Sequence, residues 1–379
     1  MTDIPVKGAV IEWARIFRGL SPEEAAEKMG LTVNELIEIE AGTRLPTLTQ
    51  FVKFGQAYQL PLATLFRRTA PKEPEELPDF RTFEGVRPRK RFDFNVALSN
   101  VRSLQATLRI LKSEDDLFQP AHLRQYDHSG DPFAQGEKER RAIGVSVRQQ
   151  INWSVENGFR HWRAVIERTG VSVYLQNFDE TDSLGCAIWE DRDLPAILIN
   201  KAIRAENAWI FTLIHEYAHL LIRKPGISDQ NRRNPIEAFC NRFAAAFLMP
   251  TAALRWLLPE WPDRPIQWAD QTIRNAAQQL KVSAQALAIR LEELDRAPAG
   301  LNRRFATRDV APRKDSTGGG YVRTRLSEIG GRYTTSIISA LERDVIDNVH
   351  ASQALGLGPT HLEAARLYVD RQRELASGE

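Results

Sequence analysis

The sequence lacks the features of a membrane-bound or disulfide-stabilised protein. Its 379 residues include only two cysteines, Cys186 and Cys240, which are too few for a disulfide framework. No apolar run approaches the roughly 18 residues needed to cross a bilayer, and the N-terminus has no signal-peptide pattern. We therefore expect a cytoplasmic protein in a reducing compartment, with no membrane partner.

The sequence also lacks a strong charge of either sign, because its formal net charge is only +2. Its apolar and charged fractions are ordinary for a globular protein. A chain of this length is too long for one average domain and suggests about two or three.

The most informative stretch is FTLIHEYAHLLI, at residues 211–222, which is typical of a buried helix. It carries His215, Glu216 and His219 in its middle, and buried polar groups are costly without partners. The two histidines are one helical turn apart, so both rings can reach one zinc ion. Glu216 is placed where a carboxylate can activate a metal-bound water. The alternative is a buried helix with two hydrogen-bonded histidines.

A catalytic zinc needs a third protein ligand, and the segment PIEAFCNRFAAAFLMP at 235–250 supplies a candidate. Pro235 and the spacing of the phenylalanines predict a second helix, which Glu237 opens. Asn241 follows one turn later on the same face, where it can orient a ligand. Together the two helices predict a Zn²⁺ site with His215, His219 and Glu237 as ligands.

Residues 8–68 are predicted to form five short helices with tight turns. Ser21 and Glu24 form a capping box, Gly30 makes a turn, and Thr32 caps the next helix. The segment from Ser21 to Phe66 resembles an Xre-type (lambda-repressor-like) helix-turn-helix domain, and the resemblance rests on the spacing of Ala25, Gly30, Val33, Gly42 and Pro46. In that fold the helix TVNELIEIE enters the DNA major groove.

The net charge of this domain does not decide whether it binds DNA or a protein. Basic and acidic residues balance within residues 1–68, and Glu35, Glu38 and Glu40 lie on the recognition helix, which is a poor match to a polyanion. Thr32, Asn34 and Arg44 are the candidate DNA contacts. The alternative is a domain that docks a protein or forms a homodimer.

Three strands are expected at 171–176, 184–189 and 196–200, directly before the histidine helix. Strands and helices in this order predict a small α+β layout. In zinc peptidases of this architecture an edge strand can hold a peptide in extended form. We expect AILIN, at 196–200, to be that strand.

The segment IRNAAQQLKVSAQALAIRLEELD reads as two helices, which either imitate a second helix-turn-helix or pack behind the zinc site; we favour packing. The predicted fold class is α+β and predominantly helical. An all-α helix-turn-helix domain (1–69) and a linker (70–95) precede a zincin-like metallopeptidase domain (96–300) with a three-stranded sheet. A flexible break (301–320) and a helical C-terminal region (321–379), with three helices, complete the chain.

TLIHEYAHLLI and IEAFCNRFAAAFLMP make the chain resemble the ImmA/IrrE family of metallopeptidases, in the version fused to an Xre-type domain. The resemblance implies that His215, His219 and Glu237 bind zinc and that Glu216 is the general base. A donor for the tetrahedral oxyanion is also expected. The sequence does not identify this donor, although Tyr217 is a candidate.

The resemblance implies a regulatory zinc endopeptidase that cleaves a specific protein, such as a transcriptional repressor, in a stress, damage or mobile-element response. The helix-turn-helix domain can carry the peptidase to a partner on DNA. The alternative is an antitoxin of a toxin–antitoxin pair, or a transcriptional regulator, that binds a toxin or DNA rather than cleaving a substrate.

Overall fold

The computed structural model describes residues 3–71, 92–114, 118–178, 184–203, 205–228, 234–258, 261–306 and 320–377. Most of the predicted linker and most of the predicted break at 301–320 lie outside these residues. The chain divides into two compact units, of which the first is mainly residues 1–76 and the second contains most of residues 101–379. None of the helices in the described ranges is both long and apolar enough to cross a membrane.

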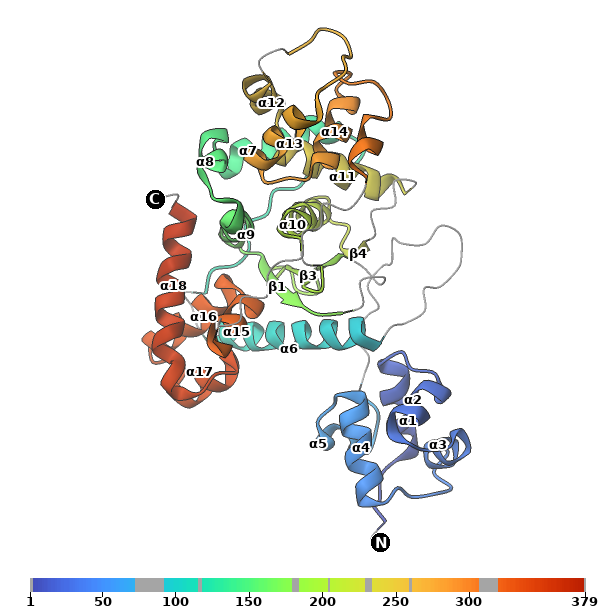
Figure 1. Ribbon diagram of the computed structural model, residues 1–379. Coiled ribbons are helices and arrows are strands. Elements are labelled where there is room, and N and C mark those ends of the chain that lie inside the picture. Colours follow the sequence, from blue (N-terminus) through green and yellow to red (C-terminus); the bar gives the residue numbers. More distant parts are fainter. Residues whose placement is uncertain are drawn as a thin grey trace. The chain divides into compact units, whose positions relative to one another are not determined.

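The first unit contains the five predicted helices, drawn in blue in Figure 1: α1 (Gly8–Phe17), α2 (Pro22–Met29), α3 (Val33–Glu40), α4 (Leu48–Tyr58) and α5 (Leu62–Leu65). The capping boxes at Ser21 and Thr32 are both formed, and Gly30 has a φ of 66°, which favours glycine. The helices close around a core that includes Ile11, Leu36, Phe51 and Phe54. The predicted helix-turn-helix fold is therefore confirmed.

The second unit is built on a sheet with the strand order β1-β3-β2-β4. The three predicted strands are confirmed as β1 (Ser172–Gln176), β2 (Gly185–Ile188) and β3 (Ala196–Asn200), and a short strand β4 (Gly226–Ser228) extends the sheet. β3 pairs in parallel with β1 and antiparallel with β2. AILIN is therefore an interior strand, and its expected role as the edge strand is wrong. Its unbroken apolar run fits burial on both faces.

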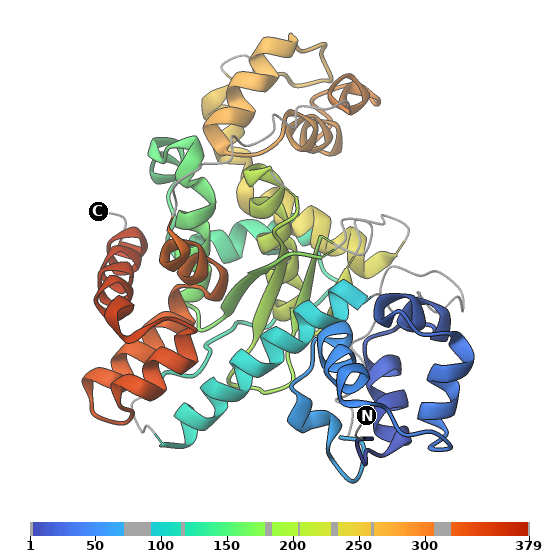
Figure 2. The same cartoon turned by 60° about the horizontal axis from the view of Figure 1, so that its bottom comes forward.

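The histidine helix, α10 (Glu206–Leu221), covers one face of the sheet (Figure 1). Val173, Ile197 and Ile199 point into the core on this side. The long helix α6 (Phe92–Glu114) belongs to this unit from residue 101 onward, and that part lies on the opposite face of the sheet (Figure 2). From α6, Gln105 accepts a hydrogen bond from the hydroxyl of Tyr174 in β1 and donates to the carbonyl of Leu194.

A layer of helices covers α10 on the side away from the sheet. α11 (Pro235–Leu248) packs against α10 and against α7 (Pro132–Ile143). α8 (Val147–Asn152), α12 (Thr251–Leu257), α13 (Asp270–Leu280) and α14 (Ala284–Glu293) complete this layer, with the 3₁₀ turns η1 (Val155–Asn157) and η2 (Leu301–Phe305). α13 and α14 bury their apolar faces in the same core as α10, as predicted for a packing role.

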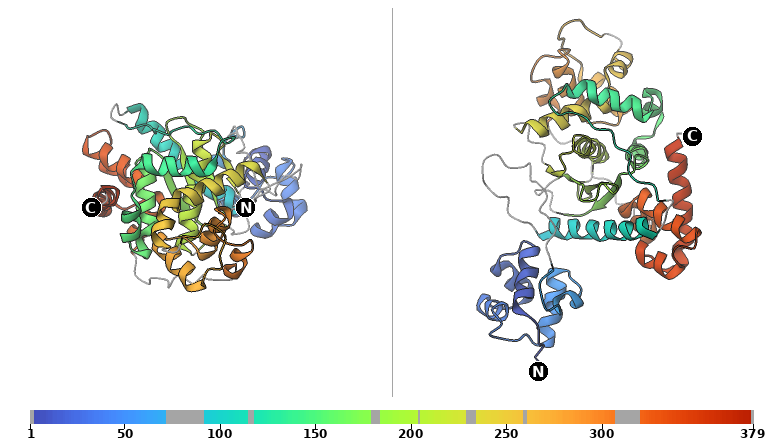
Figure 3. Two further views of the ribbon diagram at one scale, coloured as in Figure 1. Left: turned by 90° about the horizontal axis from the view of Figure 1, so that it is seen from above. Right: turned by 180° about the vertical axis from the view of Figure 1, so that it is seen from behind.

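The C-terminal region has four α-helices among its described residues, not the three expected: α15 (Tyr321–Ile329), α16 (Gly331–Glu342), α17 (Asn348–Leu355) and α18 (Leu362–Ser377). A short 3₁₀ turn, η3 (Pro359–His361), precedes α18. Gly330, with a φ of 87°, separates α15 from α16. α18, in red in Figure 3, packs against α9 (Gly158–Glu167), which in turn contacts α10. The structure thus confirms a predominantly helical α+β fold.

Candidate metal centre

α10 and α11 bring His215, His219 and Glu237 into one cluster, with possible ligand atoms all within 4.8 Å of one another. The Nε2 atoms of the two histidines are 3.2 Å apart. Nε2 of His215 lies 3.1 Å from Oε2 of Glu237, and Nε2 of His219 lies 3.2 Å from Oε1. All three side chains are buried. The structure thus joins the three residues that the sequence proposed as ligands.

The ring of His219 is fixed by the turn that follows α10. Its Nδ1 lies 2.9 Å from the carbonyl oxygen of Lys224 and donates to it, so the lone pair of the neutral ring is on Nε2, the atom that faces His215 and Glu237. The chain reaches this position because Arg223 has a φ of 58°, in the left-handed region. A backbone carbonyl of this kind orients histidine ligands in metal sites.

The electrostatics of the cluster favour a charged carboxylate between the rings. Burial alone would raise the pKa of Glu237, but the contacts of its carboxylate with the imidazoles of His215 and His219 outweigh it and lower that pKa. Burial lowers the pKa of His219. For His215 the lowering by burial is outweighed by the hydrogen bond to Glu237 and the charge of Glu216, so its pKa is raised. A carboxylate and a neutral imidazole are the protonation states that bind metal.

The surroundings of these residues suit a metal-binding role better than a purely structural one. Both carboxylate oxygens of Glu237 are buried and have no hydrogen-bond partner within the described ranges beyond the two imidazole contacts. Buried acceptors without donors are costly, and a cation shared with two imidazoles satisfies them. Two imidazole nitrogens and one carboxylate form a donor set typical of catalytic zinc.

Glu216 lies against strand β2. It is 1% exposed, and a Cβ added to Gly185 of β2 would lie 3.1 Å from Cγ of Glu216 and 2.6 Å from Cγ2 of Thr212. Only a glycine allows this close approach of the strand to α10. β2 therefore fixes the position of the carboxylate next to His215, and the sequence alone gave no signal for this contact.

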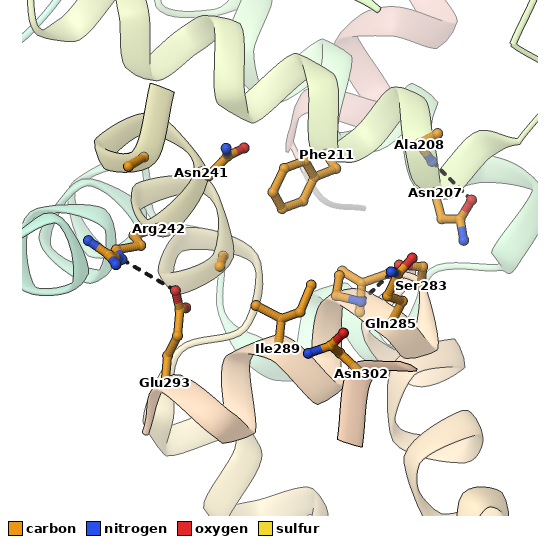
Figure 4. Close-up of a pocket in the computed structure, with 14 residues that line it drawn as sticks. Asn207, Ala208, Phe211, Asn241, Arg242, Ser283, Gln285, Ile289, Glu293 and Asn302 are labelled. Atoms are coloured by element: carbon orange, nitrogen blue, oxygen red, sulfur yellow. Dashed lines mark hydrogen bonds and ion pairs between the residues drawn. The ribbon is translucent and has the colours of Figure 1, made fainter. Parts of the chain in front are cut away.

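A cleft of about 430 Å³ lies beside the cluster, between α10, α11, α14 and η2 (Figure 4). Asn241 and Phe211 point into it, one from each of the two cluster-bearing helices. Arg242 and Glu293, at its wall, form an ion pair of 3.3 Å, so they bring no net charge. The side chain of Asn241 also helps to raise the pKa of His215. Asn241 thus lies between the cleft and the cluster.

The prediction that Tyr217 could be the oxyanion donor is wrong. Its hydroxyl donates to Oε1 of Glu139 at 2.8 Å, inside the core and away from the cleft. Glu139 also accepts from the hydroxyl of Tyr126 at 2.9 Å. This buried network anchors α10 to α7, and the sequence reasoning missed it because its members are far apart in the chain.

Two of the three candidate DNA contacts in the first unit, Thr32 and Arg44, interact with residues of α3. Arg44 pairs with Glu35 at 2.9 Å and lies 3.8 Å from Glu38. The hydroxyl of Thr32 accepts from the amide of Glu35 as an N-cap. Asn34 is exposed on the first turn of α3. The structure therefore places the three residues near one another on the surface, with the arginine beside carboxylates.

Fold and site together define a metallopeptidase-type domain joined to a helix-turn-helix domain. Comparison with known domain families agrees: residues 166–292 match the IrrE N-terminal-like domain of the M78 peptidases, and residues 11–65 match the helix-turn-helix family. The chain therefore contains a helix-turn-helix domain and an IrrE-like peptidase domain in one polypeptide. No curated protein matches the chain.

Proposed function

We propose that the chain is a regulatory, zinc-dependent endopeptidase that cleaves a specific protein partner. The observation that carries the proposal is the buried cluster of His215, His219 and Glu237, whose carboxylate oxygens lack other partners within the described ranges. These three side chains would hold zinc, and Glu216 lies next to them. The match to the IrrE-like peptidase domain supports the same chemistry.

The roles of the residues follow from their placement. Zinc bound here would supply a lowered pKa for water and polarisation of the scissile carbonyl. Glu216 accepts a proton from the attacking water and returns it to the leaving amine. Its burial against β2 keeps the carboxylate in one position, so that the proton is transferred at a fixed site.

We propose that the cleft beside the cluster receives the substrate segment. Its polar lining consists mainly of amides and hydroxyls, and its charged pair, Arg242 and Glu293, is internally neutral. An uncharged peptide segment is therefore the favoured occupant. Because AILIN is an interior strand, another strand must hold an extended substrate peptide at the sheet edge. We propose β4 for this role, because it follows α10 and, among the described residues, pairs only with β2.

The biological role we infer is control of a partner such as a transcriptional repressor, in response to stress, damage or a mobile element. The helix-turn-helix match supports a regulatory setting, because this fold commonly binds DNA. The peptidase would then act on a protein near the DNA.

A substrate trap tests the proposal. Tagged Glu216→Gln protein should keep its zinc, fail to cleave, and retain the intact partner in a pull-down, whereas wild type releases fragments. Glu206→Gln makes the same chemical change at the other end of α10 and should cleave normally. Full cleavage by Glu216→Gln would overturn the enzymatic proposal.

A second candidate is supported by exposed apolar and acidic residues of the first unit. Ile37 on α3 is 49% exposed and is followed by the exposed Glu38, and Leu48 at the start of α4 is 58% exposed. An apolar and acidic surface suits a protein better than a phosphate backbone. The chain would then act by binding, as an antitoxin or transcriptional regulator. Binding lost in Ile37→Lys but kept in Glu216→Gln would favour it.

The DNA-binding version of this candidate relies on Thr32, Asn34 and Arg44. A gel shift on the chain's own promoter across a salt series separates it from protein docking. A specific shift that Arg44→Gln abolishes supports DNA binding. If Arg44→Gln leaves the shift unchanged, Arg44 is not a DNA contact.

A further inference from the structure

A second pocket, of about 320 Å³, lies between α9, α16 and α18 and is separate from the metal cluster. Four arginines line it: Arg168 at the end of α9, Arg332 and Arg343 on α16, and Arg373 on α18. None of these residues has a role in the proposed peptidase chemistry. The inference drawn from this pocket therefore stands independently of the proposed function.

The pocket wall on α16 is a continuous polar stripe. Arg332, Ser336, Ser339 and Arg343 follow one another at intervals of three or four residues, which places them on one face of the helix. The opposite face carries buried core residues, among them Tyr333, Ile337 and Leu341. α16 thus presents two arginines and two hydroxyls to the pocket, while its apolar side is used for packing.

The pocket lining contains one acidic residue, Glu167, against the four arginines. Glu167 is buried, and its Oε1 accepts from Nε of Arg163 at 3.2 Å. Both of its oxygens lie 3.1 Å from the backbone amide of Gly331, at the start of α16. Glu167 hydrogen-bonds to Arg163 and Gly331, and its charge also acts on Arg332. One carboxylate against four arginines leaves the pocket with an excess of positive charge. The pairing of Arg373 with Asp370, at 3.3 Å, is between two exposed groups and is weak.

Arg332 is the best-placed of the four arginines for a ligand. Its Nη2 donates to the carbonyl of Gln119 at 2.7 Å, and its guanidinium lies 5.5 Å from the ring of Phe118. Its Nε is buried and lacks a hydrogen-bond partner in the part of the chain that the structure describes. Burial also lowers the pKa of Arg332. A buried cationic donor in this state is stabilised by a nearby anion.

We propose that this pocket binds the phosphate group of a small molecule. The planar fork of arginine matches phosphate oxygens, and four such groups around one cavity form a strong phosphate-binding set. The hydroxyls of Thr335 and Ser339 offer further donors to the ester. The volume suits a free phosphate, a phosphorylated metabolite or a mononucleotide. Bound there, the ligand would join α9, which packs on α10, to the C-terminal helices α16 and α18.

The test uses the purified full chain and three probes: inorganic phosphate, AMP, and sodium chloride at matched ionic strength. Calorimetric titration should show saturable binding of phosphate or AMP and none of chloride. Tighter binding of AMP identifies an ester as the source of the phosphate group, and equal or tighter binding of inorganic phosphate identifies the free ion.

The variants decide whether this pocket is the site. The double variant Arg168→Gln/Arg343→Gln changes two exposed side chains, so the fold should persist, and affinity should fall at least about tenfold because two charge-assisted hydrogen bonds are lost. Arg366→Gln, which removes the same charge from α18 outside the pocket, should bind like wild type. Absence of saturable phosphate or AMP binding, or unchanged affinity in the double variant, would overturn the proposal.

Discussion

The contact between Gly185 and Glu216 yields a sharp prediction. In Gly185→Ala the new methyl group would lie 2.6 Å from Cγ2 of Thr212, 3.1 Å from Cγ of Glu216 and 3.1 Å from the carbonyl oxygen of Leu198. None of these neighbours yields easily, because threonine is β-branched on a buried helix and the carbonyl belongs to β3. Strand and helix must separate, and overpacking of this kind lowers the free energy of unfolding by about 1–3 kcal/mol.

Denaturant unfolding followed by tryptophan fluorescence measures this loss. Of the eight tryptophans only Trp13 lies in the helix-turn-helix unit, so the signal reports mainly the second unit. Gly358→Ala is the matched control, because a Cβ there meets its nearest neighbour at an ordinary 3.8 Å, and its stability should stay within about 0.5 kcal/mol of wild type. Cleavage should also fall in Gly185→Ala, because Glu216 is displaced. Wild-type stability in Gly185→Ala would refute the reasoning.

Three further predictions concern the cluster and its surroundings. Removal of metal with a chelator should lower the melting temperature, and zinc should restore it, since an ion present at a hundredfold over its Kd stabilises by about 3 kcal/mol; a metal-depleted protein with unchanged melting temperature contradicts this. Tyr217→Phe should lower the free energy of unfolding by about 1–3 kcal/mol, because Glu139 loses a donor. Its cleavage rate should remain normal. A rate as low as that of Glu216→Gln would instead show that Tyr217 takes part in catalysis. Asn241→Ala should weaken zinc binding about 10- to 100-fold in a chelator competition, through looser orientation of His215; unchanged affinity rejects that role.

The cluster could be predicted from the sequence because its geometry is local. Helical periodicity alone places His215 and His219 on one face, and Glu237 opens a helix whose apolar pattern requires burial. The capping boxes at Ser21 and Thr32 are local in the same way. In each case the residues that interact are within a few positions of one another, or on a pair of strongly patterned helices.

What the sequence could not predict depends on contacts between distant segments. Strand order is one example: AILIN became an interior strand because β2 and β1 pair on either side of it, which periodicity does not specify. The short β4 has only three residues and therefore no pattern to detect. The arginine pocket combines α9 with α16 and α18, more than 150 residues apart in the case of Arg168 and Arg332.

The burial of α10 has a consequence for how this site can diversify. Every residue from Thr212 to Leu221 is buried, with strands below, α9 at one side and α11 above. A random substitution in this stretch will therefore impair folding before it alters chemistry. Variants with new substrate preferences should instead arise on α14 and η2, where Gln285, Ile289 and Asn302 face the cleft without holding the cluster. A saturation library scored separately for soluble yield and cleavage would show this division along the chain.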